Sequence, residues 1–508
     1  MKLKTFIAST FVIHTMLAVV CTADVKLPPV FADHMILQQN QKLPVWGTAD
    51  PEEKVTVEFA GQIAETTADK NGCWKLILAP VAAKDTQTMT VKGKNTVTLN
   101  DILLGEVWLC SGQSNMAFTL SQAKNAKQEI SEADYPAIRQ FSVFRKVSGQ
   151  PNRSLTGKWT ICTPDKAGQL SAVGYFFARE IYKELKVPVG ILCAAVGDTP
   201  GAAWTPVEVM DKNPELNPVL QRFKQDCIGS EEKMKAFQKA VAELKIAIKE
   251  AEASGKKPPR GIQEPMNEMN FRRPGGLFNG MIYPLAPYAM RGVLWYQGEN
   301  DCARSVEYRH LLPAMISSWR ELWGQGDFPF YIVQLANFGR EKTDPNQFGG
   351  WPELRAVQAT TAAKLTNCGL AVTIDIGDAA NIHPVNKQDA GKRLSLWALA
   401  KDYNKKDVIY SGPVFKSMNA EGGTLCLSFD SVGGGLIVKG EVLKGFAIAG
   451  NDNKYYWAEA RIQGDTVVVS SAKVSNPVTV RYAWGDNPSC NLYNKAGLPA
   501  VPFNAKLP

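Results

Sequence analysis

Histidine is scarce in this chain of 508 residues, and its four positions narrow the search for a catalytic base. His14 falls in an N-terminal apolar segment, His34 in a strand-like region and His310 on a helical stretch. His383 lies in a polar loop just past an apolar run that ends near residue 376. Because catalytic groups of open α/β sheets gather at the carboxyl ends of strands, we expect His383 to be a general base.

A serine stands at a comparable position earlier in the chain. Ser114 lies in the segment Ser-Gly-Gln-Ser-Asn-Met at residues 111–116, directly after an apolar strand that ends at Cys110. A serine hydroxyl becomes a nucleophile when a base removes its proton and backbone amides face the developing oxyanion. A strand-end serine in a tight turn that contains glycine meets both needs, so Ser114 is the candidate nucleophile.

A third polar segment, Trp-Tyr-Gln-Gly-Glu-Asn at residues 295–300, also follows an apolar strand. Its Glu299 carboxylate could orient or neutralise a histidine, and its Gln297 amide could donate a hydrogen bond to an oxyanion. The alternative interpretation is an ordinary polar turn.

The elements that would position these groups alternate between strand and helix. Helical patterns at 173–185 and 308–322 are interleaved with buried-strand candidates, which lie at 106–110, 189–196, 292–296, 328–335 and 370–376. This alternation predicts an α/β fold with a parallel sheet.

Both flanks of this region are rich in strands. Alternating patterns at 54–59 and 88–91 predict a small β-sandwich, and strand-like runs return after residue 407. Within the α/β region, apolar residues from Met234 to Ala251 step by three and four along a helix. We expect this helix to belong to an insertion that packs on the catalytic body, with Ser230 as its N-cap; an interaction helix is the alternative.

The predicted organisation therefore has four parts: a signal peptide (1–23), an N-terminal β-sandwich (24–100), an esterase-like α/β domain (101–407, with a helical insertion at about 207–270) and a C-terminal β-rich domain (408–508). Lys2 and Lys4, an apolar stretch and small residues up to Ala23 are typical of a cleaved secretory signal, so we expect a secreted or periplasmic protein. An N-terminal membrane anchor is the alternative, and no later segment is apolar enough to span a bilayer.

The charge and cysteine content exclude several classes of function. The net charge of +8, which falls to about +6 without Lys2 and Lys4, is scattered and indicates a solvated surface rather than nucleic-acid binding. The cysteines are widely and irregularly spaced, with no pair at C-x-x-C distance, so neither a zinc knuckle nor a redox motif is expected.

Taken together, the motifs resemble the sialate O-acetylesterase family, within the broader SGNH-type esterases. The resemblance runs over nearly the whole chain and rests on these blocks: Gly-Gln-Ser-Asn-Met at 112–116, Trp-Tyr-Gln-Gly-Glu at 295–299, Trp-Gly-Gln-Gly-Asp-Phe-Pro-Phe at 323–330, Ile-His-Pro at 382–384 with Asn-Lys-Gln at 386–388, and Arg-Tyr-Ala-Trp at 481–484.

The resemblance implies an SGNH-hydrolase-like parallel-sheet domain between β-rich domains, and hydrolysis of acetyl esters on sugars without metal or organic cofactor. It implies that Ser114 is the nucleophile and His383 the base. It also implies an oxyanion hole made by the amides of Ser114 and Gly197, with Gln297 as a side-chain donor.

The sequence departs from the family pattern in two places. Many SGNH enzymes carry Asp three residues before the histidine, where this chain has Ala380. The acid is therefore Asp378, Glu299 or Asp375, or the site works as a dyad. Asp198 stands where the family has the second glycine of Gly-Gly-Thr, which would place a carboxylate near the oxyanion hole.

The expected partner is a small molecule or glycan that carries O-acetyl groups. The family favours sialic acid, whose carboxylate an arginine would recognise; candidates are Arg272, Arg273, Arg291 and Arg355. The alternatives are acetylxylan or another acetylated polysaccharide and, from a different class, a non-catalytic carbohydrate-binding protein on a degenerate hydrolase body.

Overall fold

A long mixed sheet organises the computed structural model, which describes residues 24–83 and 85–507. The predicted signal peptide thus lies outside the described residues. The catalytic part of the sheet has the order β13-β12-β11-β7-β10-β8-β9. All neighbouring pairs along this path are parallel except β8 with β9, and the strands are β7 (Thr96–Gly112), β8 (Tyr135–Val143), β9 (Gly157–Cys162), β10 (Val189–Ala195), β11 (Gly292–Tyr296), β12 (Phe330–Val333) and β13 (Cys368–Ala371).

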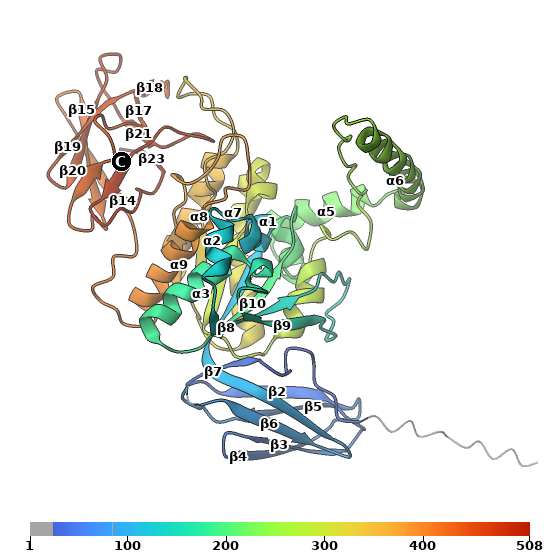
Figure 1. The fold of residues 1–508 in the computed structure, drawn as a ribbon. Helices are drawn as coiled ribbons and strands as arrows, with labels where there is room; N and C mark the ends of the chain where they lie inside the picture. The colour runs from blue at the N-terminus through green and yellow to red at the C-terminus, as the bar shows by residue number, and fades with distance from the viewer. Residues whose placement is uncertain (1–23, 84, 508) are drawn as a thin grey trace, which may run out of the picture.

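Helices cover both faces of this sheet (Figure 1). The buried residues of α3 (Ala172–Leu185) and α9 (Lys387–Lys401) share a core with Trp108 and Cys110 of β7. Val107 and Leu109 point to the opposite core, which contains residues of α7 (Ser305–Trp323) and α8 (Trp351–Lys364). Because successive strand residues alternate between faces, a strand segment covered on both sides must be apolar, as residues 107–110 of β7 are here.

Strand β7 also belongs to the N-terminal β-domain. Its first half pairs antiparallel with β6, and its second half pairs parallel with β10 and β11. The N-terminal strands are β1 (Ile36–Gln38), β2 (Leu43–Thr48), β3 (Lys54–Phe59), β4 (Gln62–Thr67), β5 (Cys73–Leu78) and β6 (Gln87–Lys92). One continuous strand thus joins the two parts, which lie one below the other in Figure 1.

The C-terminal strands form a separate β-rich unit beside α8 and α9 (Figure 1). They are β14 (Val414–Glu421), β15 (Thr424–Asp430), β16 (Leu436–Val438), β17 (Phe446–Ala449), β18 (Tyr456–Trp457), β19 (Glu459–Gln463), β20 (Thr466–Ser470), β21 (Thr479–Tyr482), β22 (Leu492–Asn494) and β23 (Phe503–Lys506). The predicted fold class, a parallel-sheet domain flanked by β-rich domains, is confirmed.

The end of a strand differs from prediction where the apolar run in the sequence continues beyond the strand. The run at 370–376 continues past β13, yet residues after Ala371 form a buried turn in which the Ile376 amide donates to the Thr373 carbonyl, 3.2 Å away. Burial alone does not distinguish a strand from a buried turn.

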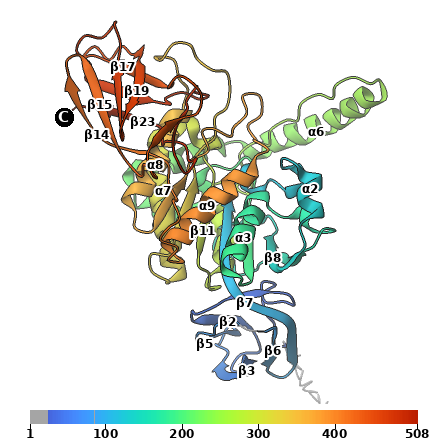
Figure 2. The same cartoon turned by 60° about the vertical axis from the view of Figure 1, so that its left-hand side comes forward.

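The packing predicted for the helix that contains Met234 to Ala251 is wrong. The insertion contains α4 (Val207–Asp211), α5 (Asn217–Asp226) and α6 (Ser230–Ala253), and α6 has no buried residue. Figures 1 and 2 both show α6 extending away from the sheet. Gly229, with a φ of 68°, is its N-cap, and Ser230 is its first residue. Periodicity predicts an apolar stripe on a helix but not what covers that stripe.

Membrane-spanning helices, metal-binding clusters and disulfides are absent from the residues that the structure describes. No helix there is both long and apolar enough to cross a bilayer. Residues 24–83 and 85–507 contain no cluster of three or more His, Cys, Asp or Glu side chains that could hold a metal ion. The cysteines of this part of the chain are free thiols.

Candidate active site

The site is built where β7 and β11 end side by side. Gly112, the last residue of β7, has a φ of 135°, and a Cβ atom added there would lie 2.1 Å from the Tyr296 carbonyl oxygen. Only glycine allows this close approach. The chain then turns into the short helix α1 (Ser114–Ala117), which begins at the predicted nucleophile.

The structure brings Ser114 and His383 together. The His383 Nε2 atom lies 2.8 Å from Ser114 Oγ, although the two residues are 269 positions apart in the sequence. The loop that carries His383 crosses back over the sheet from β13. It pairs with the segment after β12 through a bridge between Phe338 and Asp378, and the Gly377 amide donates to Asn337 Oδ1.

The surroundings of His383 favour its neutral form. Partial burial lowers the pKa of the imidazole, and the positive charge of Lys387 lowers it further. The ring also stacks on Phe118, with 6.4 Å between ring centroids. A neutral imidazole in contact with a serine hydroxyl can accept its proton, which is the task of a general base.

None of the three candidate carboxylates is hydrogen-bonded to His383 within the described residues. Asp378 is exposed, and its Oδ1 accepts from the amides of Ala380 and Asn381, so it shapes the histidine loop. Asp375 forms a forked ion pair with Arg393 and accepts from the Tyr493 hydroxyl. Glu299 is buried and accepts from the Asn115 side chain at 2.5 Å.

Ser114 and Gly197, the two residues expected to supply oxyanion amides, lie close together. Ser114 is the first residue of α1, and the amide of a first helical residue has no partner within the helix. Gly197 follows β10, and a Cβ atom at this position would lie 3.3 Å from the Ser114 Cβ. The glycine therefore allows the two backbone segments to approach each other, as an oxyanion hole made from both amides requires.

The expected oxyanion donor Gln297 is committed elsewhere. Its side chain is fully buried, and its Nε2 donates to the Thr199 carbonyl at 3.1 Å and to Asp301 Oδ2 at 2.5 Å. Its Oε1 accepts from the Tyr308 hydroxyl. Both amide hydrogens of Gln297 already have acceptors. The side chain therefore links Thr199, Asp301 and Tyr308 and does not donate into the oxyanion hole.

Asp198 adopts the left-handed conformation that its position requires. Its φ is 59°, a value that glycine adopts freely and that Asp tolerates better than most residues. Its carboxylate is exposed, accepts from Asn300 Nδ2 at 2.8 Å and lies 3.8 Å from the Arg272 guanidinium. The predicted carboxylate next to Gly197 is therefore present and turned toward Asn300.

The sequence analysis did not identify Asn115 and Lys387 as functional candidates, although both lie in the motif blocks at 112–116 and 386–388. Asn115 directly follows the nucleophile, and Lys387 lies four residues after His383; both side chains are buried. Lys387 Nζ donates to Asn115 Oδ1 at 2.5 Å. Their positions next to Ser114 and His383 were the available signal, but a buried lysine cannot be recognised from sequence alone.

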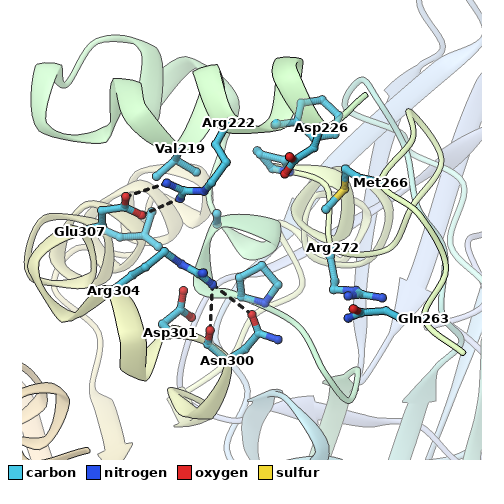
Figure 3. A pocket seen from close by; sticks show the side chains of 15 residues that line it. Val219, Arg222, Asp226, Gln263, Met266, Arg272, Asn300, Asp301, Arg304 and Glu307 are labelled. Carbon is cyan, nitrogen blue, oxygen red and sulfur yellow. Dashed lines mark hydrogen bonds and ion pairs between the residues drawn. The ribbon is translucent and has the colours of Figure 1, made fainter. Parts of the chain in front are cut away.

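A pocket of about 350 Å³ lies near the loop that follows β10, and neither Ser114 nor His383 lines it (Figure 3). Its walls come from α5, from the segment that returns from α6 and from the 3₁₀ helix η7 (Glu299–Arg304). Arg222 forms a forked pair with Glu307, and Arg304 donates to Asn300. Asn300 lines the pocket and donates to Asp198, so it connects the pocket to the loop that carries Gly197.

The four arginines named from sequence have different surroundings. Arg355 is fully buried and donates to backbone carbonyls, among them those of Leu335 and Gly485. Arg291 pairs with Glu106, and Arg273 lies 3.3 Å from Glu268. Of these four arginines, Arg272 is the one that lines the pocket, where Figure 3 shows it beside Gln263.

The chain is similar to known carbohydrate acetylesterases. A family model described as carbohydrate esterase, sialic acid-specific acetylesterase, matches residues 267–395. The chain is 29% identical to sialate O-acetylesterase of Mus musculus over 94% of its own length and 93% of the relative's. The human protein of the same name is 28% identical over 93% and 90% of the two chains.

A solved structure is similar over nearly its full length. The crystal structure of a carbohydrate acetylesterase from Xanthomonas citri has a TM-score of 0.79 and 36% identity to this chain. The match covers 95% of this chain and 99% of that one.

The environment of His383 gives a direct prediction. Because burial and Lys387 both disfavour the imidazolium, the folded protein should titrate His383 below the usual value of about 6.5. NMR spectra of protein labelled at histidine, recorded from pH 4.5 to 8, measure this midpoint, and the His383→Asn variant identifies the signal. A midpoint above about 6.5 would contradict the described surroundings.

Proposed function

Because the chain belongs to the sialate O-acetylesterase family of carbohydrate esterases, we propose that it hydrolyses O-acetyl esters on sugars through Ser114 and His383. Membership of this family makes it a carboxylic ester hydrolase. The observation that carries the proposed mechanism is the 2.8 Å contact between Ser114 Oγ and His383 Nε2 at the end of β7.

The first half of the reaction forms an acetyl-enzyme. His383 Nε2 accepts the Ser114 proton while Oγ attacks the acetyl carbonyl carbon. The N–H groups of Ser114 and Gly197 face the resulting oxyanion, and each such donor contributes about 3 kcal/mol to transition-state stabilisation. The imidazolium of His383 then protonates the departing sugar oxygen, and the carbon–oxygen bond to the sugar breaks.

Water completes the cycle. His383, neutral again, takes a proton from a water molecule that attacks the acetyl carbonyl. The second oxyanion uses the same two amides, and its collapse releases acetate and returns the proton to Ser114. No carboxylate takes part, because neither Asp378 nor Glu299 is hydrogen-bonded to the imidazole in the described part of the chain.

The pocket that Asn300 and Arg272 line is the proposed place for the sugar. O-acetylated sialic acid is the first candidate substrate, since the curated relatives are named for it and Arg272 could receive its carboxylate. Asp198 favours a second candidate, a neutral acetylated polysaccharide such as acetylxylan. Its carboxylate lies 3.8 Å from Arg272 and would repel the carboxylate of an acidic sugar.

The proposed nucleophile is tested by Ser114→Ala. The variant should lose release of acetate from an aryl acetate by about 10⁴-fold or more, with an unchanged thermal melt. Ser131→Ala, which changes an exposed serine at the end of α2 (Ala126–Ser131), is the matched control and should keep full activity. A fluorophosphonate probe should label Ser114 in the wild type. Retained turnover in Ser114→Ala would refute the mechanism, and an unlabelled wild type would favour a carbohydrate-binding protein.

The two substrate candidates are separated by one further variant. Arg272→Met should lower kcat/KM for O-acetylated sialic acid by about tenfold or more, because a charged contact is lost, and leave an aryl acetate unaffected. Arg260→Met, an exposed change in the same insertion, is the control. If the wild type prefers acetylxylan and Arg272→Met changes neither rate, the neutral polysaccharide is the substrate.

A further inference from the structure

Behind Ser114 and His383 lies a buried polar cluster that the proposed reaction does not use. Its members are Lys387 from the start of α9, Asn115 from α1 and Glu299 from the start of η7. The Lys387 and Asn115 side chains are almost inaccessible to solvent. Polar groups buried this deeply stabilise a fold only when their hydrogen bonds are satisfied, so their geometry is informative.

Asn115 is the centre of the cluster. Its Oδ1 accepts from Lys387 Nζ at 2.5 Å, and its Nδ2 donates to Glu299 Oε1 at 2.5 Å and to the Ile382 carbonyl at 3.0 Å. Lys387 can only donate, so it fixes which end of the Asn115 amide faces which neighbour. The amide is thereby aimed at Ile382, the residue directly before His383.

Lys387 also approaches His383 from a second side. Its ammonium group lies 4.6 Å from the centroid of the Phe118 ring and 5.3 Å from that of Tyr296. Phe118 in turn stacks on the His383 imidazole. The lysine thus supports the histidine through its backbone, by way of Asn115, and through its ring, by way of Phe118.

The charges around the lysine come from several elements. Glu299 on η7 is the facing carboxylate, and its Oε2 atom is buried without a hydrogen-bond partner among the described residues. The negative charge of Asp301, on the same 3₁₀ helix, helps to raise the pKa of Glu299. Tyr296 at the end of β11 faces Lys387 and Glu299. Burial lowers the pKa of Lys387 to about 7 and raises that of Glu299.

We propose that Lys387 is a positioning residue for the esterase reaction, which holds His383 over Ser114 through Asn115 and the Ile382 carbonyl. In many serine hydrolases a carboxylate orients the histidine through its other ring nitrogen. Here the orientation comes from the Asn115 side chain, which donates to the backbone carbonyl before His383, and the charge of the lysine adds to the effect of partial burial in favouring the neutral imidazole. This inference rests on the proposed function.

The first test replaces the lysine with an uncharged side chain of similar length. In Lys387→Met, kcat for an aryl acetate should fall by about 10²-fold with little change in KM, because a small displacement of a catalytic base has effects of this size. The acid limb of the pH dependence of kcat/KM should move to higher pH, since the charge that lowers the pKa of His383 is gone. Lys392→Met, an exposed change on the same helix, should match the wild type.

A second variant separates positioning from stability. Lys387→Met leaves Glu299 buried without its counter-charge and should lower the thermal melting temperature. The double variant Glu299→Gln, Lys387→Met removes both charges and should recover most of that loss while kcat stays low. This variant also keeps the proposal testable if the single variant does not fold.

Two results would overturn the inference. One is a folded Lys387→Met protein with the kcat and pH profile of the wild type. The other is a double variant that recovers kcat together with stability, since the lysine would then act only by balancing the charge of Glu299. A wild type that releases no acetate would instead count against the proposed function.

Discussion

The hydrogen bond between Ser114 Oγ and His383 Nε2 can form only if two distant segments reach the same edge of one sheet. Ser114 lies at the end of the central strand β7, whereas His383 follows β13 at the far side of the sheet order. The histidine loop must therefore cross the ends of β12 and β11. It is held on the way by Asn337, and at its end by the amide of Asn115 beside the serine. The contact therefore depends on the parallel sheet, on its apolar strands and on the glycine at position 112.

The electrostatics of the site follow from the same arrangement. None of the candidate carboxylates among the described residues is hydrogen-bonded to His383. No such hydrogen bond therefore orients the imidazole or stabilises its protonated form. Its basicity is set by partial burial and by a buried lysine, both of which favour the neutral ring. A neutral histidine near physiological pH is the form that can remove a proton from serine. The buried cluster of Lys387, Asn115 and Glu299 supplies rigidity where a triad acid would otherwise do so.

Much of this site could be predicted from sequence because its key residues directly follow strands. Ser114, Gly197 and Glu299 come after apolar runs, and the parallel sheet brings such strand ends together. The oxyanion role expected for Gln297 does not fit its hydrogen bonds, because an amide after a strand can point into the core as easily as toward substrate. The surroundings of α6 were mispredicted for a similar reason: its stripe is visible in the sequence, but the absence of a packing surface is not. The Lys387 side chain is buried among residues of α1, β11 and η7, which meet only in three dimensions.

The central claim is that acetyl passes through the Ser114 oxygen, and the covalent intermediate tests it most directly. Protein mixed with an aryl acetate for milliseconds, quenched in acid and digested should give a peptide containing Ser114 that carries one added acetyl group. Fragmentation should place that group on the serine oxygen, and the signal should be absent from Ser114→Ala. Turnover with an acetyl group found on another residue, or with none at any mixing time that resolves the reaction, would contradict the account.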